Sequence, residues 1–417
     1  MPKIIEHAKQ IKQRYFIFFK WFILASIVGL IVGTFSTLFH FAIEKATLLR
    51  ISYNYLIYFM PLAGLIIVFL YNITHQPDEL NTNLVLECVR SSKHLPLIMA
   101  PLIFLSTVLT HLVGGSSGRE GAALQLGGSL STYIGERLHL DENDLRILTM
   151  CGMSAAFSAL FRTPIGATIF SMEVISVGIM YYVALVPCII AAVVGYAISG
   201  YFGVAATRYP LNFITSLNFI TLFQVVVLGI LCALLSILFC KTLHMAHALY
   251  SKYFKNPYLR ICMGSFFVIT LTLLLDSTDY LGAGMPIIEN ALSGHVFPFA
   301  FLLKIIFTAL TLGAGFKGGE IVPSFFVGAT FGAMIGPLLG LPAYFSASLG
   351  LIALFCGVTN CPMTSFILST EIFGGGGIYF MLIIATSYML SGYSGLYTKQ
   401  KMMYSKFKPE FRNELTH

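Results

Sequence analysis

Long apolar stretches recur along most of the chain and determine the architecture that it predicts. Several are long enough, or nearly so, to cross the roughly 30 Å hydrocarbon layer of a bilayer as a helix. Others are short or interrupted by Gly and Pro, and the whole pattern predicts about ten helical passages. We therefore expect an all-α multi-pass membrane protein. The clearest runs are "FILASIVGLIVGTFSTLFHF", "LIYFMPLAGLIIVFLY", "YYVALVPCIIAAVVGYAI", "LFQVVVLGILCALLSILFC" and "YFMLIIATSYML".

Composition and charge support a membrane location and indicate an orientation. Hydrophobic residues make up 57% of the chain and charged residues 10%, whereas about a quarter of a soluble domain is charged. Basic residues gather beside the first and last apolar segments, so the positive-inside rule places both termini in the cytoplasm and the protein in the cell membrane. The net charge of +7 then reflects topology and contact with the lipid bilayer, not nucleic acid. The basic residues are Lys3, Lys9, Lys12, Arg14 and Lys20 at the start, and Lys399, Lys401, Lys406, Lys408 and Arg412 at the end.

Two halves of the chain resemble each other. "GREGAALQLG" from Gly118 aligns with "GEIVPSFFVG" from Gly319, at an offset of 201 residues. The same offset aligns "LNTNLVLE" from Leu80 with "LGAGMPII" from Leu281, and a shift of three residues aligns "RTPIGATIFSMEV" with "NCPMTSFILSTEI". Repeats of this kind indicate a duplicated unit. We predict a basic N-terminus (1–14), a first membrane repeat (15–200), a linker (201–214), a second repeat (215–398) and a basic tail (399–417).

The glycine-rich blocks of both halves predict a site for a small negative ion. Transporters built from two repeats place their site between the repeats, where interrupted helices begin. The first N–H groups of a helix have no carbonyl partner and lie at the positive end of its dipole, so they favour an anion. Glycine lets the backbone approach an ion closely. The candidate helix starts are "LNTNL", "GSSGREG", "LGAGMP" and "GFKGGEIVP".

Glu120 is the candidate gate of this site. An ionisable residue inside a membrane segment costs about 3 kcal/mol on insertion scales, which makes it a functional candidate. Its carboxylate mimics an anion and can occupy the anion's place among backbone donors. Protonation would release it, so Glu120 would act both as gate and as proton acceptor. The alternative is structural, with Glu120 capping a helix or pairing with Arg119.

These motifs together resemble the CLC family of anion channels and proton-coupled anion exchangers. The resemblance rests on "GSSGREG", on "GGEIVP" before a helix and on the duplicated "P…E" helices, and it extends from about residue 15 to 398. It implies two inverted repeats of tilted, partial helices, a homodimer with one pore in each subunit, and a gating glutamate at Glu120. It also implies an anion-facing tyrosine at Tyr397 in "SGLYTKQK", for which Tyr393 is a rival.

The first motif departs from the pattern of typical chloride members, which have Gly-Ser-Gly-Ile-Pro. Here Thr82 keeps a hydroxyl group but has no flanking glycine. "TNLVLE" and "GFKGGEIVP" are closer to the fluoride-exporting branch, which carries a glutamate like Glu320 but usually has Met or Asn at Thr82 and Thr at Val322. Because fluoride holds its water tightly and needs strong donors, Thr82, Ile321 and Val322 favour chloride or a broad anion specificity.

We therefore expect an anion shell formed by Thr82, by backbone groups near Gly121 and Ile321, and by Tyr397. Glu320 and Val322 are candidates for selectivity, while Arg119 and Glu173 are candidates for a structural or ion-pathway role.

Proton coupling is left open by the sequence. The helix that holds Glu173 carries the inner proton relay of chloride exchangers, and the relay position falls on Val174. Its loss fits a channel, or an exchanger with another proton route. Glu173 and Glu371 occupy repeated positions, which favours buried carboxylates paired with Arg119, Arg162 or backbone donors.

An enzyme is the remaining alternative class. "GSSG" resembles the nucleophile motif of intramembrane serine proteases, with Ser117 as nucleophile. That interpretation gives no reason for the duplicated glycine blocks, so we expect no enzyme. No metal and no cofactor are expected either, because no H-E-x-x-H motif or carboxylate cluster accompanies the histidines.

Overall fold

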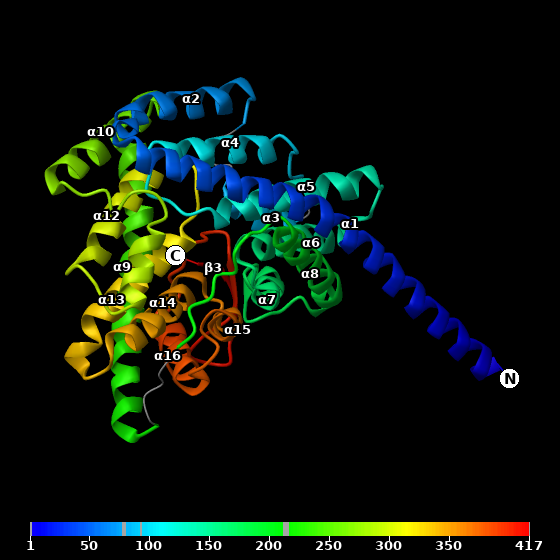
Figure 1. Ribbon diagram of the computed structural model, residues 1–417. Coiled ribbons are helices and arrows are strands. Elements are labelled where there is room, and N and C mark those ends of the chain that lie inside the picture. Colours follow the sequence, from blue (N-terminus) through cyan, green and yellow to red (C-terminus); the bar gives the residue numbers. More distant parts are fainter. Residues whose placement is uncertain (1, 77–80, 92–93, 212–216, 417) are drawn as a thin grey trace.

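The computed structural model describes residues 2–76, 81–91, 94–211 and 217–416 (Figure 1). Sixteen α-helices lie in this part of the chain, in two sets of eight. Residues 212–214 of the predicted linker, residues 215–216 at the predicted start of the second repeat, and Leu80 of the aligned block lie outside the described residues. The first set is α1 (Pro2–Ser52), α2 (Met60–Ile73), α3 (Thr82–Ser91), α4 (Met99–Leu112), α5 (Glu120–Arg137), α6 (Glu142–Phe161), α7 (Pro164–Glu173) and α8 (Leu185–Tyr201).

The second set repeats the first in order and in relative length. A short helix follows the second long one in each set, and a ten- to twelve-residue helix beginning at proline stands seventh. The packing is also repeated, since α1 packs against α6 and α8 while α9 packs against α14 and α16. The second set is α9 (Phe219–Tyr253), α10 (Pro257–Leu275), α11 (Met285–Leu292), α12 (Ala300–Gly313), α13 (Ile321–Ile335), α14 (Ala343–Thr359), α15 (Pro362–Phe373) and α16 (Gly377–Leu390).

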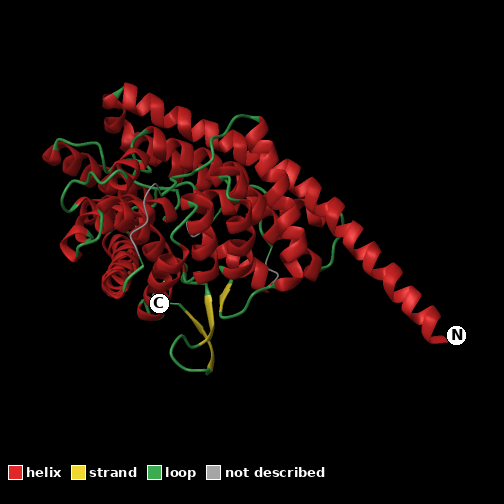
Figure 2. Cartoon of the chain, turned by 60° about the horizontal axis from the view of Figure 1, so that its bottom comes forward, coloured by secondary structure: helices red, strands yellow, loops and turns green. Residues whose placement is uncertain are grey.

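Helix α1 is much longer than a bilayer is thick. Its 51 residues extend about 77 Å at 1.5 Å per residue, against a hydrocarbon layer of about 30 Å. Figures 1 and 2 show its N-terminal part projecting beyond the other helices. This projecting part carries the basic residues that the sequence assigns to the membrane surface.

Seven helices of the described residues are long and apolar enough to cross a membrane. The expectation of about ten passages counted segments by their hydropathy alone. Several apolar helices have only 10–17 residues, among them α4, α12, α14 and α16. A helix of 14 residues extends about 21 Å, which is less than the thickness of the hydrocarbon layer, so any end that lies inside the bilayer must be satisfied by protein.

Glycines let the central helices of each set approach closely. A Cβ atom added at Gly127 of α5 would overlap the Gly152 carbonyl of α6, and one at Gly328 of α13 would overlap the Gly350 carbonyl of α14. Gly127 and Gly328 are the glycines that align in the two repeats. Small residues at such crossings are typical of membrane helices, where close van der Waals packing replaces the hydrophobic effect.

The C-terminal segment forms structure that its basic composition did not indicate. β2 (Lys401–Tyr404) and β3 (Phe411–Leu415) form an antiparallel hairpin, and β2 also pairs in parallel with β1 (Ser176–Val177) (Figure 2). Three short 3-10 helices complete the described elements: Asn54–Phe59, Tyr182–Ala184 and Pro337–Leu339. The residues just after the second set are thereby tied to the end of the first.

Replacing Gly127 with alanine tests the close packing of α5 on α6. The added methyl group must push the helices apart, so we expect Gly127→Ala to lower stability by roughly 1–3 kcal/mol. Thermal unfolding in detergent measures this. Gly377→Ala is the control, because no atom lies within 4 Å of a Cβ at that position. Equal melting temperatures for the two variants would contradict the packing described here.

Candidate functional site

Three of the four predicted helix starts converge between the two sets. Gly118 and Gly319, which align in the repeats, form an isolated antiparallel bridge. Each donates its N–H to the carbonyl of the other, at 2.7 and 2.8 Å. This bridge brings the start of α5 against the start of α13. Thr82, the first residue of α3, joins them, with its hydroxyl 3.3 Å from the Gly121 carbonyl oxygen.

A buried lysine donates hydrogen bonds to backbone carbonyls at the fourth block, "LGAGMP". Lys304 of α12 donates from Nζ to the carbonyls of Tyr280 and Gly282, at 3.0 and 2.6 Å. Its Nζ also lies 5.2 Å from the centroid of the Phe326 ring. The Lys304 amino group therefore links this block to α12 through backbone carbonyls.

Glu120 lies at the centre of the converging helix starts, and its side chain is fully buried. Its Oε2 accepts the backbone N–H of Arg119 at 3.0 Å and that of Val322 at 3.3 Å. Its Oε1 is buried and has no hydrogen-bond partner in the part of the chain that the structure describes. The carboxylate thus rests on backbone donors from both sets, which is the arrangement that helix starts offer to an anion.

Arg119 is directed elsewhere. Its Nη1 lies 2.9 Å from Nδ1 of His40 on α1, and His40 lies 3.8 Å from Glu44. Among the described hydrogen bonds of Arg119, the one to the Glu120 carboxylate comes from its backbone N–H and not from its guanidinium group. The guanidinium group therefore anchors the loop before α5 to α1 through the histidine.

The start of α13 supplies the remaining predicted residues near Glu120. Ile321 and Val322 are buried there, and Glu320 stands as the N-terminal cap residue, half-buried. The Glu320 and Glu120 carboxyl groups lie within electrostatic range of each other.

The two rival tyrosines have different surroundings. The Tyr397 side chain is buried, and its hydroxyl has no hydrogen-bond partner among the residues that the structure describes. It lies within electrostatic range of Glu320 and Glu120. The Tyr393 hydroxyl lies 2.8 Å from Ser405 Oγ, and its ring packs against Phe407. Tyr393 is thus engaged by the C-terminal segment, while Tyr397 has an unused donor beside the carboxyl groups.

Glu173 and Glu371 each cap a helix of the opposite set. Glu173 accepts the backbone N–H groups of Met363 and Thr364 at the start of α15, at 3.0 and 2.8 Å, and the Thr364 hydroxyl at 2.6 Å. Glu371 accepts those of Ile165 and Gly166 at the start of α7, at 3.1 and 2.7 Å. The carboxylates therefore have backbone donors as partners, one of the arrangements that the sequence left open. Val174 lies beside Glu173 as a buried apolar side chain.

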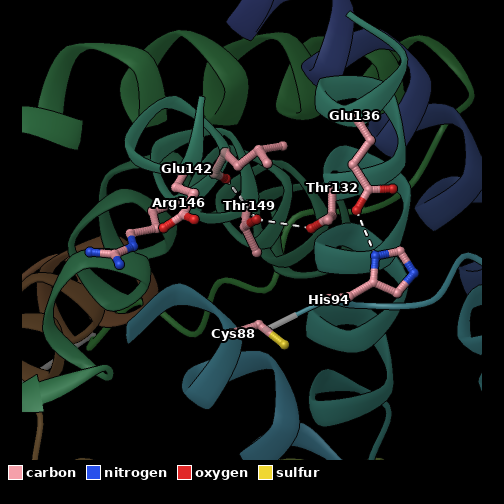
Figure 3. A pocket seen from close by; sticks show the side chains of 8 residues that line it. Cys88, His94, Thr132, Glu136, Glu142, Arg146 and Thr149 are labelled. Carbon is pink, nitrogen blue, oxygen red and sulfur yellow. Dashed lines mark hydrogen bonds and ion pairs between the residues drawn. The ribbon is translucent and has the colours of Figure 1, made fainter. Parts of the chain in front are cut away.

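A cavity of about 110 Å³ lies away from these residues, at the C-terminal end of α5 (Figure 3). Glu136 and His94 form an ion pair of 2.7 Å in it, and Thr132 bonds to Thr149 at 2.9 Å. None of the residues that line it belongs to the site expected from the sequence. They are Cys88, His94, Thr132, Glu136, Glu142, Leu145, Arg146 and Thr149.

Comparisons with known proteins agree with this arrangement. A family model described as voltage gated chloride channel matches residues 64–392. The chain belongs to the CLC family. A chloride/fluoride channel protein of Pseudomonas syringae pv. tomato is 33% identical over 395 residues, which are 93% of this chain and 87% of that protein.

Solved CLC structures have the same fold. A CLC-type fluoride/proton antiporter superimposes with a TM-score of 0.90 at 30% identity, over 93% of this chain and 99% of that one. A slow cyanobacterial Cl−/H+ antiporter gives 0.76 at 16% identity, over 89% and 94%. The expected fold class is thus confirmed, and CLC-type anion transport across a membrane is the function of this multi-pass chain.

Ser117, the nucleophile of the protease alternative, has its Oγ buried without a hydrogen-bond partner among the described residues.

Sequence reasoning missed several polar residues around this CLC site. Lys304, His40 and Gln125 all contact the blocks that it identified. A polar residue inside an apolar run, as in "AALQLGG" and "FLLKIIF", was the available signal, because burying such a group requires a partner. Spacing alone did not indicate which block each would contact.

Replacing Glu173 with alanine tests its role as a cap. The change leaves three donors at the start of α15 without their acceptor, two of them buried, so we expect stability to fall by roughly 2 kcal/mol or more. Melting temperature and halide selectivity in liposomes are the two readouts, and selectivity should stay as in wild type. Glu414→Ala, at an exposed position in β3, is the control. Unchanged stability with lost transport would instead place Glu173 in the ion pathway.

Proposed function

We propose that this chain exchanges a small halide ion for protons, with Glu120 as both the gate and the proton acceptor. The observation that carries this proposal is the position of the Glu120 carboxylate on backbone N–H groups of both repeats. A carboxylate in that place competes with a halide for the same donors. Closing the pathway and binding a proton are then two states of one group.

The steps follow from the charge of this carboxylate. While ionised, Oε2 holds the Arg119 and Val322 amides and excludes the halide. A proton added at Oε1, which has no partner, would remove the charge and weaken both hydrogen bonds, since bonds to a charged acceptor are about twice as strong as neutral ones. The neutral side chain leaves, and the halide takes its donors.

We propose fluoride as the first candidate for the halide. The likeness to a fluoride/proton antiporter, at 30% identity and a TM-score of 0.90, supports fluoride, as does Glu320 beside the gate. Chloride is the second candidate, and the Thr82 hydroxyl at the start of α3 favours it. Tyr397 supplies a neutral O–H donor for either ion.

The same proposal includes an orientation and an internal duplication. The matching order of α1–α8 and α9–α16 supports two repeats divided near the sequence-predicted linker. The basic N-terminal part of α1 supports cytoplasmic termini. The homodimer implied by the family resemblance stays a prediction, because the structure describes a single chain.

Replacing Glu120 with glutamine tests the gate. The purified protein in liposomes should release fluoride or chloride with coupled proton movement, and Glu120→Gln should reduce proton flux at least about 100-fold, because an amide does not take up the proton. Halide electrodes and a pH-sensitive dye record the two fluxes together. Glu136→Gln removes a carboxylate at the other end of the same helix and should keep coupled transport.

Other outcomes of this experiment are equally informative. Coupled transport at wild-type rates in Glu120→Gln would remove Glu120 as proton acceptor. Chloride release without proton movement in wild type would indicate a channel. Failure of wild type to move either halide would contradict the transport proposal itself.

Replacing each tyrosine with phenylalanine separates the two candidates. We expect Tyr397→Phe to keep its stability, because the lost hydroxyl has no partner, and to weaken halide binding about tenfold. Tyr393→Phe breaks the bond to Ser405 and should leave halide binding unchanged. Calorimetric titration with fluoride and chloride measures both. The reverse pattern would assign the anion-facing role to Tyr393.

A further inference from the structure

Gln125 carries a buried amide group one helical turn beyond the start of α5. Gln125 is 2% exposed, and its Nε2 lies 3.4 Å from Thr82 Oγ1. Its Oε1 is buried without a hydrogen-bond partner among the described residues. Gly121, four residues earlier on the same face of α5, accepts the Thr82 hydroxyl at 3.3 Å. Gln125 and Gly121 thus contact Thr82 together.

We propose that Gln125 is a specificity-determining residue that provides a side-chain N–H donor to the transported halide, in a pair with Thr82. This inference rests on the proposed function and names a further residue of that site. Both bonds around the Thr82 hydroxyl are long, at 3.3 and 3.4 Å, so neither holds its group firmly. An incoming anion can therefore compete for the donors.

Rotation of the amide gives the pair two alternative hydrogen-bond patterns. A side-chain amide turned by 180° exchanges Oε1 and Nε2, and a hydroxyl group can donate as well as accept. In one pattern Nε2 donates to Thr82 Oγ1, and the hydroxyl hydrogen is available to Gly121 or to an ion. In the other pattern the Thr82 hydroxyl donates to Oε1, and the N–H groups occupy the side that has no partner. Either pattern offers one donor to an anion.

The second repeat lacks this pair, which indicates that it serves the site and not the fold. At the offset of 201 residues, Phe326 stands in place of Gln125 and Ala283 in place of Thr82. Phe326 is fully buried and packs against Gly284 and Lys304. The position on α13 that corresponds to Gln125 therefore carries an apolar ring and no side-chain donor. A scaffold role alone does not require the amide.

An amide donor has a consequence for the choice of ion. A small halide needs short, strong donors to replace its water, and leaving a buried N–H group without an acceptor is unfavourable. The hydroxyl of Thr82 and the amide of Gln125 can approach a small ion together, one from α3 and one from α5. Removing the amide should therefore weaken fluoride binding more than chloride binding.

The test compares Gln125→Met with wild type. Methionine has a similar length and no donor, so we expect fluoride binding to weaken on the order of tenfold or more, with a smaller loss for chloride. Calorimetric titration of the purified protein with sodium fluoride and sodium chloride measures binding, and liposome flux measures selectivity. Thr132→Val is the matched control, because it removes a buried hydrogen bond lower on the same helix.

A second variant distinguishes a donor from a structural role. In Gln125→Glu the side chain repels a halide while ionised and regains an O–H donor when protonated. Halide affinity should therefore recover as pH falls, by more than the wild-type protein gains over the same interval. This variant is also informative if Gln125→Met does not fold. A pH dependence equal to that of wild type would overturn the inference.

The outcomes separate this inference from the proposed function. If wild type neither binds nor moves fluoride or chloride, the proposed function fails. If wild type binds and moves a halide but Gln125→Met keeps its affinity and selectivity, only the role of Gln125 is wrong. A double-mutant cycle with Thr82→Val and Gln125→Met tests the pair. The double variant should lose less halide affinity than the sum of the two single losses, because both residues act through one shared hydrogen bond.

Discussion

A helix that ends inside a bilayer leaves backbone N–H and C=O groups that lipid cannot satisfy. This constraint dominates the structure, because several helices of each set are too short to reach both surfaces. The chain meets it with contacts between the two sets. The Gly118–Gly319 bridge satisfies the loops before α5 and α13, while Glu173 and Glu371 satisfy the starts of α15 and α7. Glu120 belongs to the same group of contacts, because its carboxylate accepts backbone N–H groups of Arg119 and Val322.

The scaffold is symmetric, but the site built on it is not. At the repeated offset, Glu120 corresponds to Ile321 and Arg119 to Glu320. One set supplies the carboxylate and the Thr82–Gln125 pair. The other supplies the Val322 amide and has Ala283 and Phe326 at the positions equivalent to Thr82 and Gln125. Duplication therefore provides the crossing helices, and substitutions at matched positions make the surroundings of Glu120 differ from those of Ile321.

The duplicated glycine and glutamate blocks carried most of the prediction from sequence. They indicated the repeats, the fold class and the convergence of the Thr82, Glu120 and Ile321 helix starts, since glycine and an intramembrane carboxylate have specific physical uses. The sequence could not indicate that α4 and α12 have only 14 residues each, because hydropathy does not record where a helix ends. It also could not pair Glu173 with α15 or Gln125 with Thr82, because those contacts depend on how the two sets cross. The C-terminal hairpin was not predicted, because the basic composition of that segment does not indicate strands.

The reciprocal caps also impose an order on biosynthesis. The amides of Ile165 and Gly166 are bonded to Glu371, which is 206 and 205 residues later in the chain. At 5–20 residues per second, a ribosome needs roughly 10–40 s to reach it. Throughout that interval α7 is in or near the membrane with an unfinished end, since its acceptor has not been synthesised. The start of α7 in the first half of the chain therefore lacks its Glu371 acceptor until the second half has been synthesised. Until then its N–H groups need another partner, such as water or the insertion machinery.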